Sequence, residues 1–310
     1  MPEPAWAIDG LFERNSLVML AGPPASFKSF LAIDWMLCMS SGKKWNNRAT
    51  RGAKVLYVLG EGKASLIKRI GAWTHYNNMD EAEMKNLNPN FRVSFEVPQL
   101  ALKPSVDNML AQLEREKYEP EVIVIDTFAR SFVGLDENSQ KDTGMWVENA
   151  DRLRQLGYTV IFLHHTSKNT EFGIKYRGST AIMGAMDTAM TLSRDGATGR
   201  LKLDVTKQKD HDEGSPMYFN RLVVKPDQTD PEGSCVLVPA SGIDERFTPD
   251  GIKIEALLKV LLEDASFDSD RSRARELARQ CGLSESAAQG RVQRARKHGD
   301  FPIDISDEIL

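Results

Sequence analysis

The chain is poor in features that would place it in several other classes of protein. Its 310 residues include only three cysteines (Cys38, Cys235 and Cys281), which lie far apart and match no metal-binding spacing. This excludes a disulfide framework and suits a reducing compartment. No apolar run approaches the roughly 18 residues of a membrane-spanning helix. The first residues, MPEPAWAIDGLFERN, contain no basic segment followed by an apolar one. We expect a cytoplasmic protein with no membrane partner.

Negative charge outweighs positive charge except near the C-terminus. The chain has 40 Lys and Arg against 44 Asp and Glu, a net charge of −4. Residues 271–298 hold eight basic and two acidic residues, a net of +6, which leaves −10 for the rest of the chain. An acidic body with a basic segment indicates contact with a polyanion at that segment.

Short apolar strands alternate with helices over most of the chain. Unbroken apolar runs are typical of parallel strands buried on both faces, and they occur at LVMLA (17–21), VLYVL (55–59), EVIVID (121–126) and YTVIFLHH (158–165). RVSF (92–95) is a further candidate strand, and helices are expected at 29–42 and 145–157. Closely spaced strands follow at 189–193, 201–205, 217–224 and 235–239. This order predicts an α/β domain over residues 1–240, with a mostly parallel sheet and an antiparallel extension.

A second, smaller helical domain is predicted for residues 251–310. After an amphipathic helix, IEALLKVLLED, two more helices flank a turn at Gly282, and the second starts from a Ser284 N-cap. The pattern is typical of a helix–turn–helix, with FPIDI as a possible wing. It favours DNA binding through Arg291, Arg294, Arg296 and Lys297. A subdomain that stabilises an oligomer, with these side chains in water, is the open alternative.

The stretch AGPPASFKSF (21–30) nearly matches the phosphate-binding loop G-x-x-x-x-G-K-[ST]. Gly22, Lys28 and Ser29 fall in register, but Phe27 stands in place of the second glycine. In such a loop, backbone N–H groups and the next helix N-terminus face the phosphates, the lysine adds a charge, and the serine hydroxyl binds Mg²⁺. We therefore expect Phe27 to adopt a backbone angle that L-residues tolerate, with its ring turned away from the nucleotide. The alternative is a simple Gly-Pro turn before a buried helix.

Polar residues at the ends of other predicted strands favour the nucleotide site. Asp126 can hold Mg²⁺, Glu61 can orient the attacking water, and His164 or His165 can sense the γ-phosphate. Carboxyl ends of parallel strands share one edge, where α/β sheets bind ligands. We predict that ATP and Mg²⁺ bind there, with Ser29 and Asp126 as metal ligands. The predicted nucleotide-binding residues are Gly22, Pro23, Pro24, Ala25, Ser26, Phe27, Lys28, Ser29, Phe30 and Asp126.

With these motifs the chain resembles the RecA-like P-loop ATPases, and within them the plasmid RepA-type hexameric helicases and related phage ATPases. The likeness covers about residues 10–225 and is carried by GPPASFKSF, VLGEG, VIVIDTFARSFVGLDENSQKD, VIFLHHTSK and YRGSTAIMGAMDTAM. It implies a RecA-type sheet, ATP bound between the subunits of a hexameric homo-oligomeric ring, and hydrolysis coupled to single-stranded DNA.

The resemblance also implies roles by position. Lys28 and Ser29 correspond to the Walker A pair, Asp126 to the Walker B carboxylate, Glu61 to the catalytic glutamate and His165 to the polar sensor. The basic groups that would reach a neighbouring subunit's nucleotide are Arg177, Lys207 and Lys209. Two segments are candidates for contact with DNA, the loop 132–142 and the more basic stretch TSKNTEFGIKYRG (166–178). For the loop, a mobile surface segment is equally plausible.

The predicted function is an ATP-driven, ring-forming motor on single-stranded DNA, of the replicative helicase type found in phage or plasmid systems. Two alternatives remain. One is a RecA-like recombination or repair ATPase that binds or anneals DNA without unwinding it. The other is a nucleotide-gated DNA-binding regulator in which Phe27 has made turnover negligible.

Overall fold

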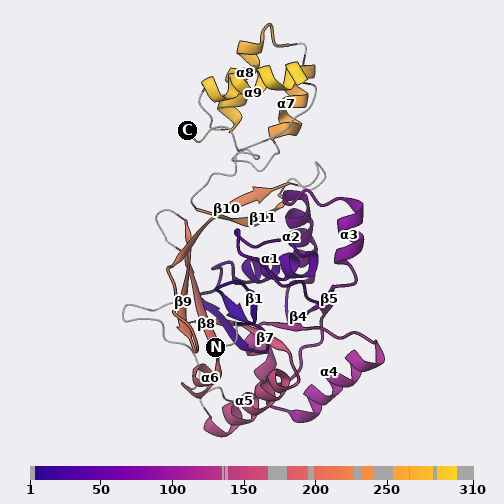
Figure 1. Cartoon of the computed structure of the whole chain (residues 1–310), viewed down its shortest axis with the longest axis vertical. Helices are drawn as coiled ribbons and strands as arrows, with labels where there is room; N and C mark the ends of the chain where they lie inside the picture. The colour runs from indigo at the N-terminus through magenta and orange to yellow at the C-terminus, as the bar shows by residue number, and fades with distance from the viewer. Residues whose placement is uncertain are drawn as a thin grey trace.

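The computed structural model describes residues 4–134, 136, 139–166, 180–194, 199–225, 232–240, 254–264, 266–281 and 285–298. Figure 1 shows a central sheet with helices on both faces, and a group of helices near the C-terminus. Several predicted features lie outside the described residues, namely Arg177 with most of 166–178, the Gly282 turn, the Ser284 N-cap and FPIDI.

One sheet of nine strands, counted over the described residues, forms the centre of the fold, in the order β11-β10-β9-β8-β3-β7-β6-β4-β5. The strands are β3 (Leu17–Gly22), β4 (Val55–Leu59), β5 (Phe91–Ser94), β6 (Val122–Asp126), β7 (Thr159–His165), β8 (Thr188–Arg194), β9 (Leu201–Gln208), β10 (Met217–Val224) and β11 (Ser234–Pro239). The six strands β8, β3, β7, β6, β4 and β5 pair in parallel, whereas β9, β10 and β11 add in antiparallel fashion. The predicted mostly parallel sheet with an antiparallel extension is confirmed.

Helices cover both faces of this sheet, as buried strands require. One face carries α1 (Lys28–Ser41), α2 (Lys63–Tyr76) and α3 (Glu81–Leu87), and the other carries α4 (Lys103–Arg115) and α5 (Gln140–Gln155). The remaining elements of the domain are a small hairpin of β1 (Trp6–Ile8) and β2 (Phe12–Glu13), the 3₁₀ turn η1 (Phe128–Phe132) and α6 (Thr180–Ala185).

Helix α1 is central to the fold because it leads directly out of the phosphate loop. Most of its side chains are buried, among them Trp35 and Met36, as its nearly all-round apolar sequence predicts. It ends where Gly42 takes a left-handed conformation (φ 72°) that lets its N–H bond the Met39 carbonyl. The predicted stop at Gly42 is confirmed.

Helix α5 begins at Gln140, five residues before the predicted start at 145. The Ser139 side chain accepts a hydrogen bond from the Asp142 N–H and caps the helix, which explains the earlier start.

Three helices near the C-terminus pack around a small core of their own. They are α7 (Ile254–Glu263), α8 (Asp270–Cys281) and α9 (Glu285–His298), and Leu261, Leu277 and Val292 lie in their core. Arg273 is buried there and donates hydrogen bonds to the Leu261 and Asp264 carbonyls at the end of α7. One of the basic residues of this segment is therefore structural.

No helix within the described parts of the chain is long and apolar enough to cross a membrane.

Candidate nucleotide site

Four adjacent strands, β3, β7, β6 and β4, end at the same edge of the sheet. Gly22 lies opposite His165, and Asp126 lies between Leu163 and Leu59. Glu61 follows Leu59 by two residues. The predicted phosphate loop, Asp126, Glu61 and His165 are thus brought to one edge, as the apolar strands with polar ends indicated. We call this the carboxyl edge.

The phosphate loop runs from the end of β3 to the start of α1. Gly22 has to be glycine, because a Cβ there would lie 2.2 Å from the Leu192 carbonyl oxygen of β8. Helix α1 begins at Lys28, and within this described loop no side chain caps it. Its first N–H groups therefore have no intrahelical partner and face the position that an anion would take.

Phe27 contradicts the expected backbone angle. Its φ of 68° and ψ of 22° place it in the left-handed region, which a non-glycine residue occupies only at a cost. Its ring packs on Phe30, with ring centroids 5.3 Å apart, and the Arg221 guanidinium lies 5.0 Å from its centroid. The loop thus keeps the conformation that a glycine would give, and aromatic and cation–π contacts help to offset the strain.

Lys28 is folded back onto the loop that precedes it. Its Nζ donates to the carbonyls of Gly22 (2.9 Å) and Pro23 (3.0 Å) and lies 3.2 Å from His165 Nδ1. Burial lowers the pKa of this ammonium to about 8, although Asp126 acts in the opposite direction. A phosphate would offer this poorly solvated cation a stronger partner than two carbonyls.

Asp126 and Ser29, the predicted Mg²⁺ ligands, are connected through Tyr57. Asp126 is buried, and its Oδ2 accepts a hydrogen bond of 2.8 Å from the Tyr57 hydroxyl. The Ser29 side chain interacts with the same hydroxyl as a hydrogen-bond donor. Among the described residues there is no cluster of three His, Cys, Asp or Glu that could hold a metal. One hydroxyl, one carboxylate and the phosphates form the sparse oxygen set that suits Mg²⁺, so the residues fit this ion.

Glu61 lies at the carboxyl edge but is paired with Arg130, a residue that sequence reasoning missed. The Arg130 Nε and Nη2 atoms lie 2.8 and 2.6 Å from Glu61 Oε1. Both side chains are more than half exposed, so the pair is weak and exchangeable. The only sequence signal was the position of Arg130 four residues after Asp126. Gly60 brings the two segments together, because its N–H bonds the Asp126 carbonyl at 2.6 Å.

The two histidines at the end of β7 differ in their surroundings. His164 is buried and packs edge-on against Phe128, with centroids 4.9 Å apart. His165 points to Lys28 instead. His165 is therefore the histidine that lies beside the phosphate loop, and its role as a sensor stays a prediction.

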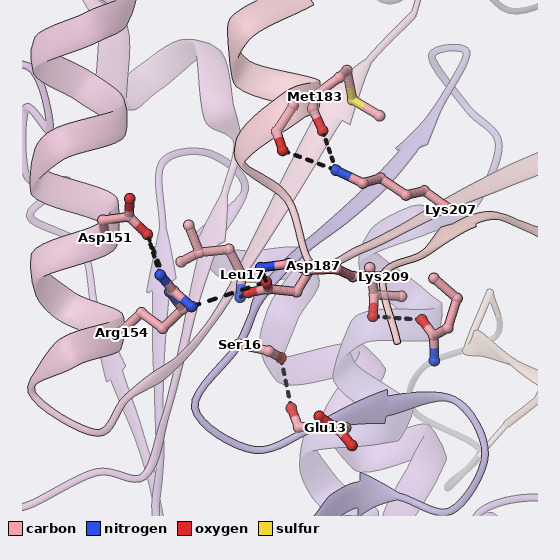
Figure 2. Close-up of polar contacts among 12 residues, drawn as sticks. Glu13, Ser16, Leu17, Asp151, Arg154, Met183, Asp187, Lys207 and Lys209 are labelled. Carbon is pink, nitrogen blue, oxygen red and sulfur yellow. Dashed lines mark hydrogen bonds and ion pairs between the residues drawn. The ribbon is translucent and has the colours of Figure 1, made fainter. Parts of the chain in front are cut away.

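Lys207 and Lys209 lie at the opposite edge of the sheet, which we call the amino edge (Figure 2). Strand β9 runs antiparallel to β8, so its end meets the start of β8 and, through β8, the start of β3. The length of β3, about 17 Å at 3.3–3.4 Å per residue, separates this edge from the phosphate loop. Neither lysine is placed to reach the phosphate loop of the same chain.

Both lysines are held by groups of their own chain. Lys207 Nζ donates to the Met183 and Gly184 carbonyls near the end of α6, at 2.9 Å each. Lys209 Nζ lies 3.3 Å from Asp187 Oδ1, and the Leu17 N–H at the start of β3 bonds Oδ2 of the same carboxylate. Lys209 is thus not held by the acidic residues that follow it directly in the sequence, Asp210, Asp212 and Glu213. The pairing of β8 with β9 brings Asp187 closer to Lys209 than the neighbouring turn brings its own acidic residues.

A polar cavity of about 130 Å³ lies beside these lysines and not beside the phosphate loop. Its basic side chains are all paired with acids, as Arg14–Glu121, Arg154–Asp151, Lys209–Asp187 and His211–Glu13. The cavity therefore offers no excess positive charge to an anion, and we assign it no ligand.

Comparison with known proteins agrees with this geometry. A family model described as AAA domain matches residues 1–171, more than half of the chain. The chain belongs to the AAA domain family. Among solved structures, one described as an ATPase domain is similar, with a TM-score of 0.50 and 14% identity over 73% of this chain and 86% of that one. Curated protein sequences gave no significant match.

The domain therefore has a RecA-like P-loop ATPase fold. As many as 622 chains of solved structures match it, so the fold is widespread and does not by itself assign a function. The function must come from the site residues.

Proposed function

We propose that the protein is an ATP-hydrolysing motor that assembles as a ring on single-stranded DNA and acts as a DNA helicase of the phage or plasmid replicative type. One observation carries the proposal: the nucleotide-binding groups and the candidate lysines lie at opposite edges of one sheet. Lys207 and Lys209 can contact a nucleotide only from a second copy of the chain, as a ring or filament provides.

In the proposed site the N-terminus of α1 and Lys28 bind the phosphates. Ser29 and Asp126 would hold Mg²⁺, which neutralises charge on the transferred phosphoryl group. Once the Glu61 carboxylate has separated from Arg130, it takes a proton from the attacking water. His165, next to Lys28, is placed to respond to the γ-phosphate. A lysine from the adjacent subunit stabilises the charge that develops, as an arginine finger does.

Mixed oligomers test the contribution from the neighbouring subunit. Glu61→Gln should bind ATP without hydrolysing it, because an amide cannot accept the proton. Lys207→Ala/Lys209→Ala should also bind ATP and lose turnover, by up to ~10³-fold. When the two proteins are co-assembled, interfaces that combine an intact Glu61 with intact lysines should recover part of the activity.

Two inactive parents that stay inactive in the mixture would remove the lysines from the site and leave Arg177 as the remaining candidate. Nucleotide binding by each parent, measured separately, is the control for folding. Stimulation of turnover by single-stranded DNA and unwinding of a forked duplex then test the motor and helicase parts of the proposal. Turnover without unwinding would favour the recombination or repair alternative.

A DNA-binding regulator with negligible turnover is the second candidate. One observation favours it, the engagement of the Glu61 carboxylate by Arg130. This candidate predicts that ATP changes the affinity for DNA, whereas DNA does not increase ATP hydrolysis. Hydrolysis of radiolabelled ATP, measured with and without DNA, distinguishes this candidate from the motor.

A further inference from the structure

Tyr57 is an unusual residue for its position. It lies in the middle of β4 and is completely buried, and its neighbours in VLYVL are all aliphatic. A buried hydroxyl needs a partner, and that of Tyr57 finds Asp126. Tyr57 is paired across the strands with Val124, and Asp126, two residues further on, points to the same face of the sheet. The phenol therefore extends diagonally from β4 to β6 and reaches the carboxylate at the end of β6.

The hydroxyl acts as a neutral donor to the carboxylate. A phenol keeps its proton at neutral pH, because its ordinary pKa is about 10. The proton therefore stays on the phenol, which donates a hydrogen bond of 2.8 Å to Asp126 Oδ2. One oxygen of Asp126 is thereby engaged and the carboxylate plane is fixed.

We propose that Tyr57 is a positioning residue for Mg²⁺, one that orients Asp126, and with it Ser29, so that their free oxygen atoms face the metal. The inference rests on the proposed nucleotide site. Without the phenol, Asp126 Oδ2 would lose its donor, and the nearby Lys28, which interacts with Asp126 electrostatically, would attract the carboxylate. Groups that orient a metal-binding carboxylate typically change metal affinity by ~10- to 100-fold when they are removed.

Tyr57→Phe tests this, with Tyr118→Phe as the matched control. Tyr118 is a second buried tyrosine, but its hydroxyl bonds the Val55 and Asn90 carbonyls, away from Asp126. The readout is binding of a fluorescent ATP analogue, first in EDTA and then during a Mg²⁺ titration, and no hydrolysis is needed. We expect Tyr57→Phe to raise the half-saturating Mg²⁺ concentration by ~10-fold or more. Affinity in EDTA should be unchanged, and Tyr118→Phe should change neither.

Two results would overturn the inference. One is a Mg²⁺ titration of Tyr57→Phe that matches the wild type. The other is an equal loss of nucleotide affinity with and without Mg²⁺, which indicates general damage to the site. Adding Tyr57→Phe to Asp126→Ala sharpens the test, because a tyrosine that acts through Asp126 has no further effect once the carboxylate is gone. If the wild-type protein shows no Mg²⁺-dependent nucleotide binding, the proposed site itself fails, and that outcome is distinct from either result.

Discussion

The two edges of the sheet hold their cations in different ways. At the carboxyl edge, Lys28 is buried against backbone carbonyls and His165, and burial lowers the pKa of its ammonium to about 8. At the amino edge, Lys209 is paired with the Asp187 carboxylate. The comparison shows that Lys28 lacks a carboxylate partner, as does Lys207 at the amino edge, whose Nζ donates to two carbonyls, whereas Lys209 already has one. At the carboxyl edge the lysine also lies beside the first N–H groups of α1, so this edge is suited to bind a phosphate.

Changing Lys28 should give the largest effect. Lys28→Ala should abolish ATP binding.

In the wild type, a lysine with a pKa lowered from 10.5 to about 8 is neutral in the free protein above pH 8 and must take up a proton to bind phosphate. ATP affinity should therefore fall as pH rises above 8, by up to about tenfold per pH unit. Lys28→Arg, which stays protonated, is the control. Titrations at pH 7, 8 and 9 measure this, and a pH-independent wild type would contradict it.

The comparison of the two edges extends to the C-terminal helices, where several cations are also paired. Arg296 lies 2.7 Å from Asp270, and Arg279 pairs with Glu276. If the remaining positive charge of α9 contacts DNA, deleting residues 250–310 should leave ATP hydrolysis intact, weaken DNA binding and flatten its salt dependence. Binding isotherms at two or three salt concentrations measure both. Unchanged affinity and slope contradict the DNA-binding role, and dissociation into monomers supports the oligomer-stabilising alternative.

The sequence predicted the frame of the fold well because buried parallel strands leave a strong apolar signal. The strands β3, β4, β6 and β7 lie within a residue or two of their predicted ends. Helices α2 and α3 were not predicted because few of their side chains are buried, three in α2 and one in α3. Helix α4 was not predicted either, although Val106, Met109, Leu110 and Leu113 stand at helical spacing and pack against the core.

The sequence predicted which residues form the candidate site but not which residues they contact. Strand ends identified Asp126, Glu61 and His165. The partners Tyr57 and Arg130 depend on strand register and on a turn after β6, which no local pattern encodes. The same holds for Asp187, which sequence distance ranks behind Asp210 as a partner for Lys209. The sequence also does not reveal the backbone angle of a single residue, and the expectation for Phe27 was wrong for that reason.

Phe27 should give the smallest effect and the most specific one. Both Phe27→Gly and Phe27→Ala lose the contacts with Phe30 and Arg221, so the difference between them isolates the backbone. At a φ of 68°, glycine should give the more stable protein by about 1 kcal/mol. Phe30, three residues later inside α1, provides a control of opposite sign: there alanine should be more stable than glycine by about 1 kcal/mol. Urea unfolding of the four variants measures both differences.

ATP affinity of Phe27→Gly should stay close to that of the wild type, because Lys28, Ser29 and the helix N-terminus bind the phosphates. If alanine is preferred at both positions, Phe27 is not left-handed in solution, and the loop does not have the conformation on which the carboxyl edge depends.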